Sequence, residues 1–220
     1  MNLTIIRKEL KAINLKVKPT GEVVLTVPSN TTQEYIDKII KKRTKWINEQ
    51  LEFFKVNRVE EIKKEYVSGE STRYLGKNYR LKIFEAIEER VKFYRGYIHI
   101  YVNDRSDKTR IKKLLDSWYK QQAKKVFEEL LNKYQEVTRQ SINKFTIREM
   151  TSRWGSCSIE KRNINLNIKL IEKPKYCIES VILHELAHLK YPYHTKEFFN
   201  YLLVYMPDYE WRKERLEKEK

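Results

Sequence analysis

The chain has few of the residues that crosslink or interrupt a polypeptide: two cysteines, five glycines and five prolines among 220 residues. Two cysteines cannot form the disulfide framework that stabilises small secreted domains. The sequence has no run of about 18 apolar residues, the length that a membrane-spanning helix requires, and no apolar signal segment at its N-terminus. These absences predict a soluble, cytoplasmic protein with no membrane partner.

Acidic residues are outnumbered, with 30 aspartates and glutamates against 46 lysines and arginines, which gives a net charge of +16. Residues 1–150 carry +13 of this excess and residues 151–220 carry +3. Such an excess can attract nucleic acid, nucleotides or acidic proteins. Charge runs of mixed sign are more typical of a solvated surface, however, and we favour that interpretation. A hydrophobic content of 40% with 12% aromatic residues excludes a disordered chain.

Histidine is also rare, yet three of the four histidines lie close together, at positions 184, 188 and 194. His184, Glu185 and His188 form the pattern H-E-x-x-H, which is typical of zinc hydrolases. On a helix His184 and His188 share one face, so both rings can reach one metal ion at about 2.0–2.1 Å. Glu185 projects beside the metal, where it can deprotonate a metal-bound water.

His194 is the predicted third ligand, six residues after His188. Three protein ligands leave the fourth position of zinc to water, which is the arrangement of a catalytic site. Glu197 and Glu210 are competing oxygen ligands, but both fit the solvent face of amphipathic helices. Cys157 as a fourth ligand would close the site and make it structural, although a single cysteine is more often a small buried residue.

Apolar residues at helical spacing predict one helix around the histidine motif, opening at Pro174 and ending at Pro192. The spacing from His184 to His194 matches the metzincin pattern, but Tyr191 stands at the position of its glycine. A tyrosine tolerates a left-handed backbone poorly, so the chain is not predicted to be a metzincin.

A second motif precedes the histidines: residues 150–158 read M-T-S-R-W-G-S-C-S. An asparagine-bearing strand at 163–170, the histidine segment 184–198 and a P-D-Y stretch at 207–209 follow in order. This combination resembles the YgjP-like metal-dependent hydrolases, relatives of the SprT-like zinc peptidases, over nearly the whole chain. Phe199 departs from the resemblance, because many relatives have tryptophan there, and this should affect packing only.

The residues and the resemblance together predict a zinc-dependent metallohydrolase, most closely a metallopeptidase, with one zinc ion per chain and a peptide or protein substrate. Arg153 or Ser156 is expected to contact the substrate, with a strand and a tight turn at Gly155 as the structural alternative for this segment. Tyr191, Tyr193 and Arg153 are the candidates for the donor that stabilises an oxyanion.

Two other functions stay open at this stage. A metal-dependent nucleoside-triphosphate pyrophosphatase would suit the basic surface, but the chain has no P-loop and no dense set of carboxylates. A non-catalytic nucleic-acid-binding module with a structural zinc would have no use for Glu185.

The predicted fold class is α+β, with a β-rich part at residues 1–105 that includes one helix, and a zincin-like core of helices with a small sheet at 106–220. The charged stretch at 57–65 is expected to be a linker or the end of the preceding helix, and His99 is interpreted as a strand residue. The strand at 164–170 is expected to form the sheet edge beside the zinc helix, where an extended peptide can pair with it. Other strands are predicted at 3–6, 13–17, 23–27, 79–84, 91–94, 97–102 and 145–150, and other helices at 31–54, 107–134, 196–205 and 209–218.

Overall fold

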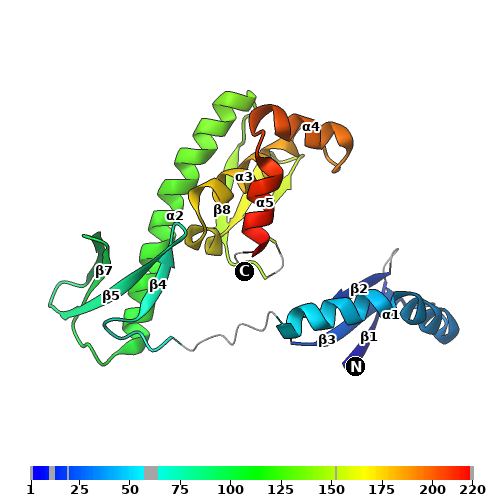
Figure 1. Cartoon of the computed structure of the whole chain (residues 1–220), viewed down its shortest axis with the longest axis horizontal. Helices are drawn as coiled ribbons and strands as arrows, with labels where there is room; N and C mark the ends of the chain where they lie inside the picture. The colour runs from blue at the N-terminus through cyan, green and yellow to red at the C-terminus, as the bar shows by residue number, and fades with distance from the viewer. Residues whose placement is uncertain (1, 10–12, 19, 57–63, 152, 219–220) are drawn as a thin grey trace. The chain divides into compact units, whose positions relative to one another are not determined.

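The computed structural model describes the chain except for residues 1, 10–12, 19, 57–63, 152 and 219–220. The described residues form three small mixed sheets and five α-helices, which confirms the predicted α+β class. The chain divides into two compact units, which are residues 1–63 and residues 64–220 (Figure 1). None of the described helices is long and apolar enough to cross a membrane. The predicted linker falls mostly on residues 57–63, outside the described part.

The first unit is a three-stranded sheet covered by one helix. Its strands are β1 (Asn2–Lys8), β2 (Asn14–Val17) and β3 (Glu22–Pro28), in the order β1-β3-β2, and α1 (Gln33–Val56) follows. β3 pairs in parallel with β1 and antiparallel with β2. Because side chains alternate along a strand, every second residue of β3 is buried against α1. The fully buried residues are Val23, Leu25 and Val27 from β3 and Ile36 and Ile47 from α1.

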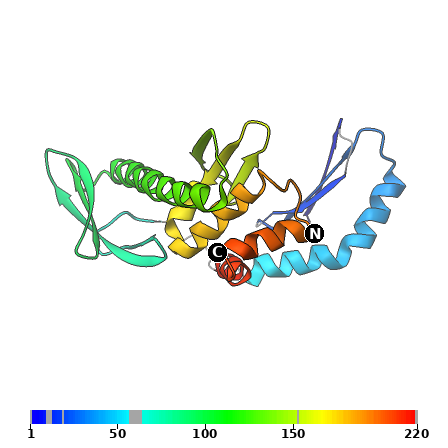
Figure 2. The ribbon, with the colours of Figure 1, turned by 90° about the horizontal axis from the view of Figure 1, so that it is seen from above.

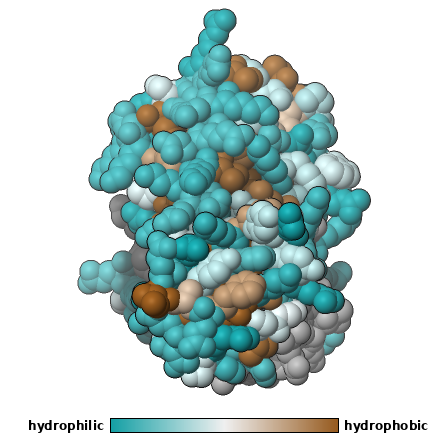
Figure 3. Space-filling view, turned by 90° about the vertical axis from the view of Figure 1, so that its left-hand side faces the viewer, coloured by the Kyte–Doolittle hydropathy of each residue, from teal (hydrophilic) through white to brown (hydrophobic). Residues whose placement is uncertain are grey.

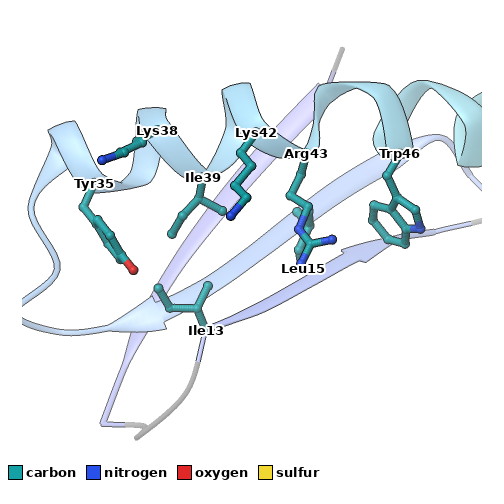
Figure 4. Close-up of a pocket in the computed structure, with 8 residues that line it drawn as sticks. All are labelled: Ile13, Leu15, Tyr35, Lys38, Ile39, Lys42, Arg43 and Trp46. Carbon is teal, nitrogen blue, oxygen red and sulfur yellow. The ribbon is translucent and has the colours of Figure 1, made fainter.

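A groove of about 610 Å³ runs between α1 and β2. Tyr35 and Trp46 stand at its two ends, and Lys38, Lys42 and Arg43 lie between them along the helix (Figure 4). Its floor is aliphatic, formed by side chains that include Ile13, Leu15 and Ile39.

The second unit begins with a four-stranded sheet packed on a long helix. Strands β4 (Ser71–Tyr74), β5 (Lys77–Glu85), β6 (Arg90–Tyr94) and β7 (Tyr97–Val102) have the spatial order β4-β5-β7-β6. Helix α2 (Lys108–Thr138) starts where the Asp107 side chain accepts a hydrogen bond from the Arg110 backbone N–H at 2.8 Å. The buried residues Ile98, Ile100 and Val102 of β7 belong to the same core as the apolar stripe of α2.

The remaining elements lie along α2 beyond this sheet (Figures 1 and 2). Strands β8 (Lys144–Arg148), β9 (Gly155–Ser158) and β10 (Asn163–Asn167) form a sheet in the order β8-β10-β9. The 3₁₀ helix η1 (Ile168–Glu172) then leads into the helices α3 (Lys175–Ala187), α4 (Lys196–Tyr205) and α5 (Tyr209–Lys218).

The prediction for the strand at 164–170 is wrong in two respects. β10 ends at Asn167, because the Asn167 side chain accepts a hydrogen bond from the Lys169 backbone N–H at 3.1 Å and starts η1. β10 is also the central strand of its sheet, paired on both sides. The sheet edge that packs against α3 is β9.

The division between the compact units does not coincide with the boundary predicted at residue 105. The four-stranded sheet shares one hydrophobic core with α2, β10 and α3. Its β4–β5 turn is also bound to η1, since the backbone N–H groups of Leu75 and Gly76 donate to Ile171 and Glu172 at 2.9 and 3.0 Å. A β-carbon at Gly76 would lie 2.6 Å from the Pro174 ring, so this contact requires glycine.

An ion-pair network around Glu179 joins three helices of the second unit. The Glu179 carboxylate of α3 accepts hydrogen bonds from Arg212 of α5 at 2.6 Å and from Lys133 of α2 at 3.0 Å. Its side chain is only 14% exposed. Burial alone would raise the pKa of Glu179, but the hydrogen bonds from Lys133 and Arg212 outweigh it and lower the pKa.

Replacing this carboxylate should therefore cost stability only where it is ionised. Glu179→Gln is expected to lower the free energy of unfolding near pH 7 by about 1–3 kcal/mol, the usual effect of losing hydrogen bonds to a charged group. The folded-state pKa is depressed, so the difference from the parent should vanish as the pH falls below about 4. Urea denaturation at several pH values measures this. Glu214→Gln, which removes an exposed pair with Lys218, is the control and should change little. A pH-independent difference would contradict the assignment.

Candidate metal centre

Helix α3 is buried along most of its length. Its apolar residues face α2, α5 and β9 at once, which is why its sequence is apolar on every side rather than amphipathic. The helix begins after Pro174, as predicted. It ends at Ala187 and not at Pro192, because the backbone N–H groups of Leu189 and Lys190 bond three residues back, to Leu186 and Ala187, and tighten the last turn.

The three clustered histidines converge on one point. His184 and His188 come from the C-terminal end of α3, and His194 comes from the segment that leads into α4. One ligand atom from each of the three rings lies within 4.8 Å of the other two. The Nε2 atoms of His184 and His194 are 3.0 Å apart. Two nitrogens that share a tetrahedral zinc ion would be separated by about 3.3 Å, so the described residues fit such an ion with a small adjustment.

Hydrogen bonds on the far side of two rings set the direction of their free nitrogens. Nδ1 of His184 lies 2.8 Å from the Tyr209 hydroxyl, and Nδ1 of His188 lies 3.2 Å from the Tyr191 carbonyl oxygen. With Nδ1 as the donor in both, each Nε2 is left as a bare lone pair for a metal. Burial, with the nearby His188, lowers the pKa of His184 to about 3, so its ring is neutral, the form that binds metals.

Phe198 of α4 supports all three rings from behind. Its ring centroid lies 5.0 Å from that of His184, 4.8 Å from His188 and 4.9 Å from His194, and the side chain is fully buried. Phe199 stacks on His194 with centroids 6.2 Å apart, consistent with a packing role.

The carboxylate of Glu185 lies against β9. A β-carbon added at Gly155 would lie 2.6 Å from its Oε1 atom, so the strand can approach the carboxylate this closely only with glycine. Glu185 is 6% exposed. Burial raises the pKa of Glu185 to about 8, and the charge of Arg153 opposes this rise.

Asn167 holds the segment that carries Arg153 at the end of β10. Its side-chain N–H₂ donates to the carbonyl oxygens of Met150 at 2.8 Å and Arg153 at 3.0 Å, and its backbone N–H donates to Trp154 at 2.8 Å. Of the structural interpretation of residues 153–158, the strand is confirmed as β9, but the tight turn at Gly155 is wrong, because Gly155 is the first residue of β9 and pairs with Leu166. The segment also borders Glu185.

The other residues that were predicted to contact the substrate, Ser156, Tyr191 and Tyr193, lie in different surroundings. Ser156 accepts a hydrogen bond from Asn165 at 3.1 Å and, by alternation along β9, lies on the face opposite Gly155. Tyr191 offers its carbonyl to His188, while its ring packs on Tyr201 with centroids 5.5 Å apart. Tyr193, just before His194, is 77% exposed.

The competing ligands lie outside the histidine cluster. Glu197 and Glu210 are both exposed, in the first turns of α4 and α5. Cys157 is half-buried on the Gly155 face of β9, where burial and then the charge of Glu185 raise the pKa of its thiol to about 11. Among the described residues, the group that could hold a metal ion therefore consists of His184, His188 and His194.

One family of known proteins matches the chain across both compact units. A family model described as the YgjP-like metallopeptidase domain matches residues 11–219. The chain belongs to the YgjP-like metallopeptidase domain family. The resemblance noted from the sequence is thereby confirmed, and with it the metallopeptidase character of the domain.

Two solved structures resemble parts of this YgjP-like chain. The metallopeptidase zymogen abylysin of Pyrococcus abyssi is 20% identical, with a TM-score of 0.39 over 42% of this chain and 93% of that one. The zymogen jannalysin of Methanocaldococcus jannaschii is 22% identical, with a TM-score of 0.38 over 42% and 88%. No curated protein matches the chain.

Tyr209 is the residue of this YgjP-like centre that sequence reasoning did not assign. It is 4% exposed and begins α5, so its hydroxyl reaches His184 from an element 25 residues away. The P-D-Y stretch at 207–209 marked the position as part of the family pattern, but its spacing carried no information about a hydrogen bond to His184.

A series of variants should grade the metal affinity of the centre, with zinc as the probe ion. His194→Ala removes a ligand and should weaken binding most. Tyr209→Phe removes only the hydrogen bond to His184 and should weaken it by roughly 10–100-fold, as the loss of such outer partners does. Glu197→Ala, the control, should bind zinc like the parent. Competitive titration with a chromophoric chelator measures all three, and loss of zinc in Glu197→Ala would overturn the ligand assignment.

Proposed function

We propose that this YgjP-like domain is a zinc-dependent peptidase in which His184, His188 and His194 bind one zinc ion and Glu185 is the general base. The observation that carries the proposal is the pairing of two groups at the end of one buried helix. Three imidazoles converge on one point, and a buried carboxylate outside that cluster stands one residue from the first of them. Membership of a metallopeptidase family supports peptides or proteins as the substrate class.

The donor set suits zinc. Imidazole nitrogens are common ligands of this ion, and three of them leave one coordination position open. When bound, the ion would act as a Lewis acid, which lowers the pKa of a water molecule and polarises the carbonyl of the substrate.

The chain's own residues supply the proton transfers. Glu185 follows a ligand by one position, so its carboxylate can take a proton from the attacking water and return it to the leaving amine. Close packing against Gly155 fixes the carboxylate and keeps bulk water from one side of it. Arg153 and Tyr193 remain the candidate donors to an oxyanion: the charge of Arg153 acts on Glu185, and Tyr193 is an exposed neighbour of His194.

Strand β9 is suited to hold an extended substrate. It pairs with β10 on one side only, so the backbone groups on its other side are available to another strand. A peptide added to this edge would run beside Gly155 and hence beside Glu185. β9 therefore takes the role that the sequence suggested for the strand at 164–170.

The alternatives have weaker support. In the described residues the centre is built from imidazoles, whereas phosphoryl chemistry prefers carboxylate-held magnesium. A purely structural metal would leave the position of Glu185 unexplained.

Removing the base should separate catalysis from metal binding. Glu185→Gln keeps the size of the side chain, so the variant should hold zinc as the parent does. Its turnover should fall by roughly 10²–10⁴-fold, the usual contribution of a positioned general acid–base group. Cleavage of a fluorogenically labelled, unfolded protein measures this, with the exposed Glu160→Gln as control. A fully active Glu185→Gln protein would refute the proposed function.

A substitution on the neighbouring strand should lower turnover in a similar way while the Glu185 carboxylate is retained. Gly155→Ala would place a β-carbon 2.6 Å from Glu185 Oε1, so the carboxylate or β9 must shift. Turnover should fall by about 10²-fold, as misplacing a catalytic group by about 1 Å does, and zinc should be retained. Parent-like turnover in this variant would show that the close packing of β9 on Glu185 is not needed.

A further inference from the structure

The outward face of the four-stranded sheet β4-β5-β7-β6 collects aromatic and basic side chains. In β7, the buried Ile98, Ile100 and Val102 point to the core, so the alternate residues Tyr97, His99 and Tyr101 form a column on the opposite side. The protein surface at this end is largely hydrophilic, with small hydrophobic patches among the hydrophilic residues (Figure 3).

The strand register places three rows of side chains across this column. Tyr97 lies between Arg80 and Tyr94, His99 between Lys82 and Lys92, and Tyr101 between Phe84 and Arg90. We call these nine residues the aromatic face. Five of them carry rings and four carry positive charges, and none is acidic.

The rings and cations of the aromatic face are in contact. Phe84 stacks on Tyr101 with centroids 5.3 Å apart, and the Lys82 ammonium lies 3.7 Å from the centroid of Tyr97. Phe84 and Tyr94 are nonetheless 39% and 53% exposed, large fractions for aromatic side chains.

Most of the positive charge here is uncompensated. Arg90 pairs with Glu88 at the rim, but no ion pair within the described residues involves Arg80, Lys82 or Lys92. Nε2 of His99 is buried without a hydrogen-bond partner in the described part of the chain.

We propose that the aromatic face binds single-stranded nucleic acid, with bases stacked on its rings and phosphates held by Arg80, Lys82 and Lys92. Rings that alternate along a strand are about 6.6 Å apart, about twice the 3.4 Å rise of a stacked nucleotide strand. Bases splayed to that spacing can interleave with the rings, whereas a duplex keeps its bases enclosed. Aromatic residues on a four-stranded sheet stack bases in the RNA-recognition domain, and stacking tolerates any base sequence.

An acidic protein is the competing partner, and the composition of the face argues against it. The carboxylates of an acidic protein need only cations as partners. The groove along α1 already provides such cations, above an aliphatic floor (Figure 4). The aromatic face adds a row of ring surfaces, which flat bases use better than acidic side chains do. The peptidase proposal and this one are independent of each other.

Fluorescence anisotropy with labelled oligonucleotides of about 12 nucleotides tests the proposal on the full chain. Oligo(dT) and oligo(U) should bind saturably at about 50 mM salt and weaken steeply toward about 200 mM, whichever of them binds tighter. A duplex of the same length and polyglutamate should bind at least about tenfold more weakly than the single strands.

Variants locate the site. Tyr97→Ala with Tyr101→Ala should weaken binding by about tenfold or more, whereas Tyr97→Phe with Tyr101→Phe should bind like the parent because stacking is kept. Arg80→Gln with Lys92→Gln should weaken binding and reduce the salt slope by roughly 1 to 1.5. Lys42→Gln with Arg43→Gln removes two charges from the α1 groove and is the matched control.

Several results would overturn the proposal. These are absence of saturable binding at low salt, equal affinity for the duplex or for polyglutamate, and parent-like binding by the Arg80/Lys92 variant. An equal loss in the Lys42/Arg43 variant would also overturn it, because bulk charge would then explain the binding. Thermal melting of each variant, together with peptidase turnover, shows whether the fold is kept. If the double alanine variant unfolds, the phenylalanine and charge variants still decide the matter.

Discussion

Helix α3 has to be buried and still present polar groups at one end, and the rest of the second unit is arranged around that constraint. Its apolar sides are covered by α2, α5 and β9. Its C-terminal end presents two kinds of polar group: His184 and His188 lie with His194 and Phe198, and Glu185 lies against Gly155. A helix fixed on every side can hold such groups in position more firmly than a loop can.

The supporting residues come from distant parts of the chain. Tyr209 orients His184 from α5, and the same helix is fastened to α3 through Arg212 and Glu179. Asn167 fastens the segment of Arg153 from the end of β10. None of these supporting side chains is proposed to contact substrate or metal. Their mutation would nonetheless disturb the positions of the residues on which the proposed chemistry depends.

The sequence predicted what is local in this structure. The i, i+4 spacing of His184 and His188 and the apolar stripe around them placed a helix and a cluster of ring nitrogens correctly. The strands of the first unit, and β5, β6 and β7 of the second, were predicted from the alternation of apolar and polar residues. The ends of helices were harder to predict. Pro192 indicated the end of α3, but the chain already turns after Ala187 through backbone hydrogen bonds that no residue type predicts.

What the sequence could not predict depends on which strands become neighbours. β10 reads as an edge strand until its pairing with both β8 and β9 is known. The need for glycine at position 155 comes from a carboxylate 30 residues later, and the Tyr209 hydroxyl reaches His184 from another helix. The aromatic face likewise exists only through register, since Arg80, Tyr97 and Tyr94 belong to three strands. From composition alone, its charges were interpreted as an ordinary solvated surface.

X-ray absorption spectroscopy at the zinc edge tests the central claim most directly. The account predicts about three nitrogen ligands from imidazole and one oxygen ligand from water, all at about 2.0–2.1 Å. A sulfur ligand at about 2.3 Å would bring Cys157 into the site and close it, and a shell of four protein ligands of any kind would contradict an open catalytic centre.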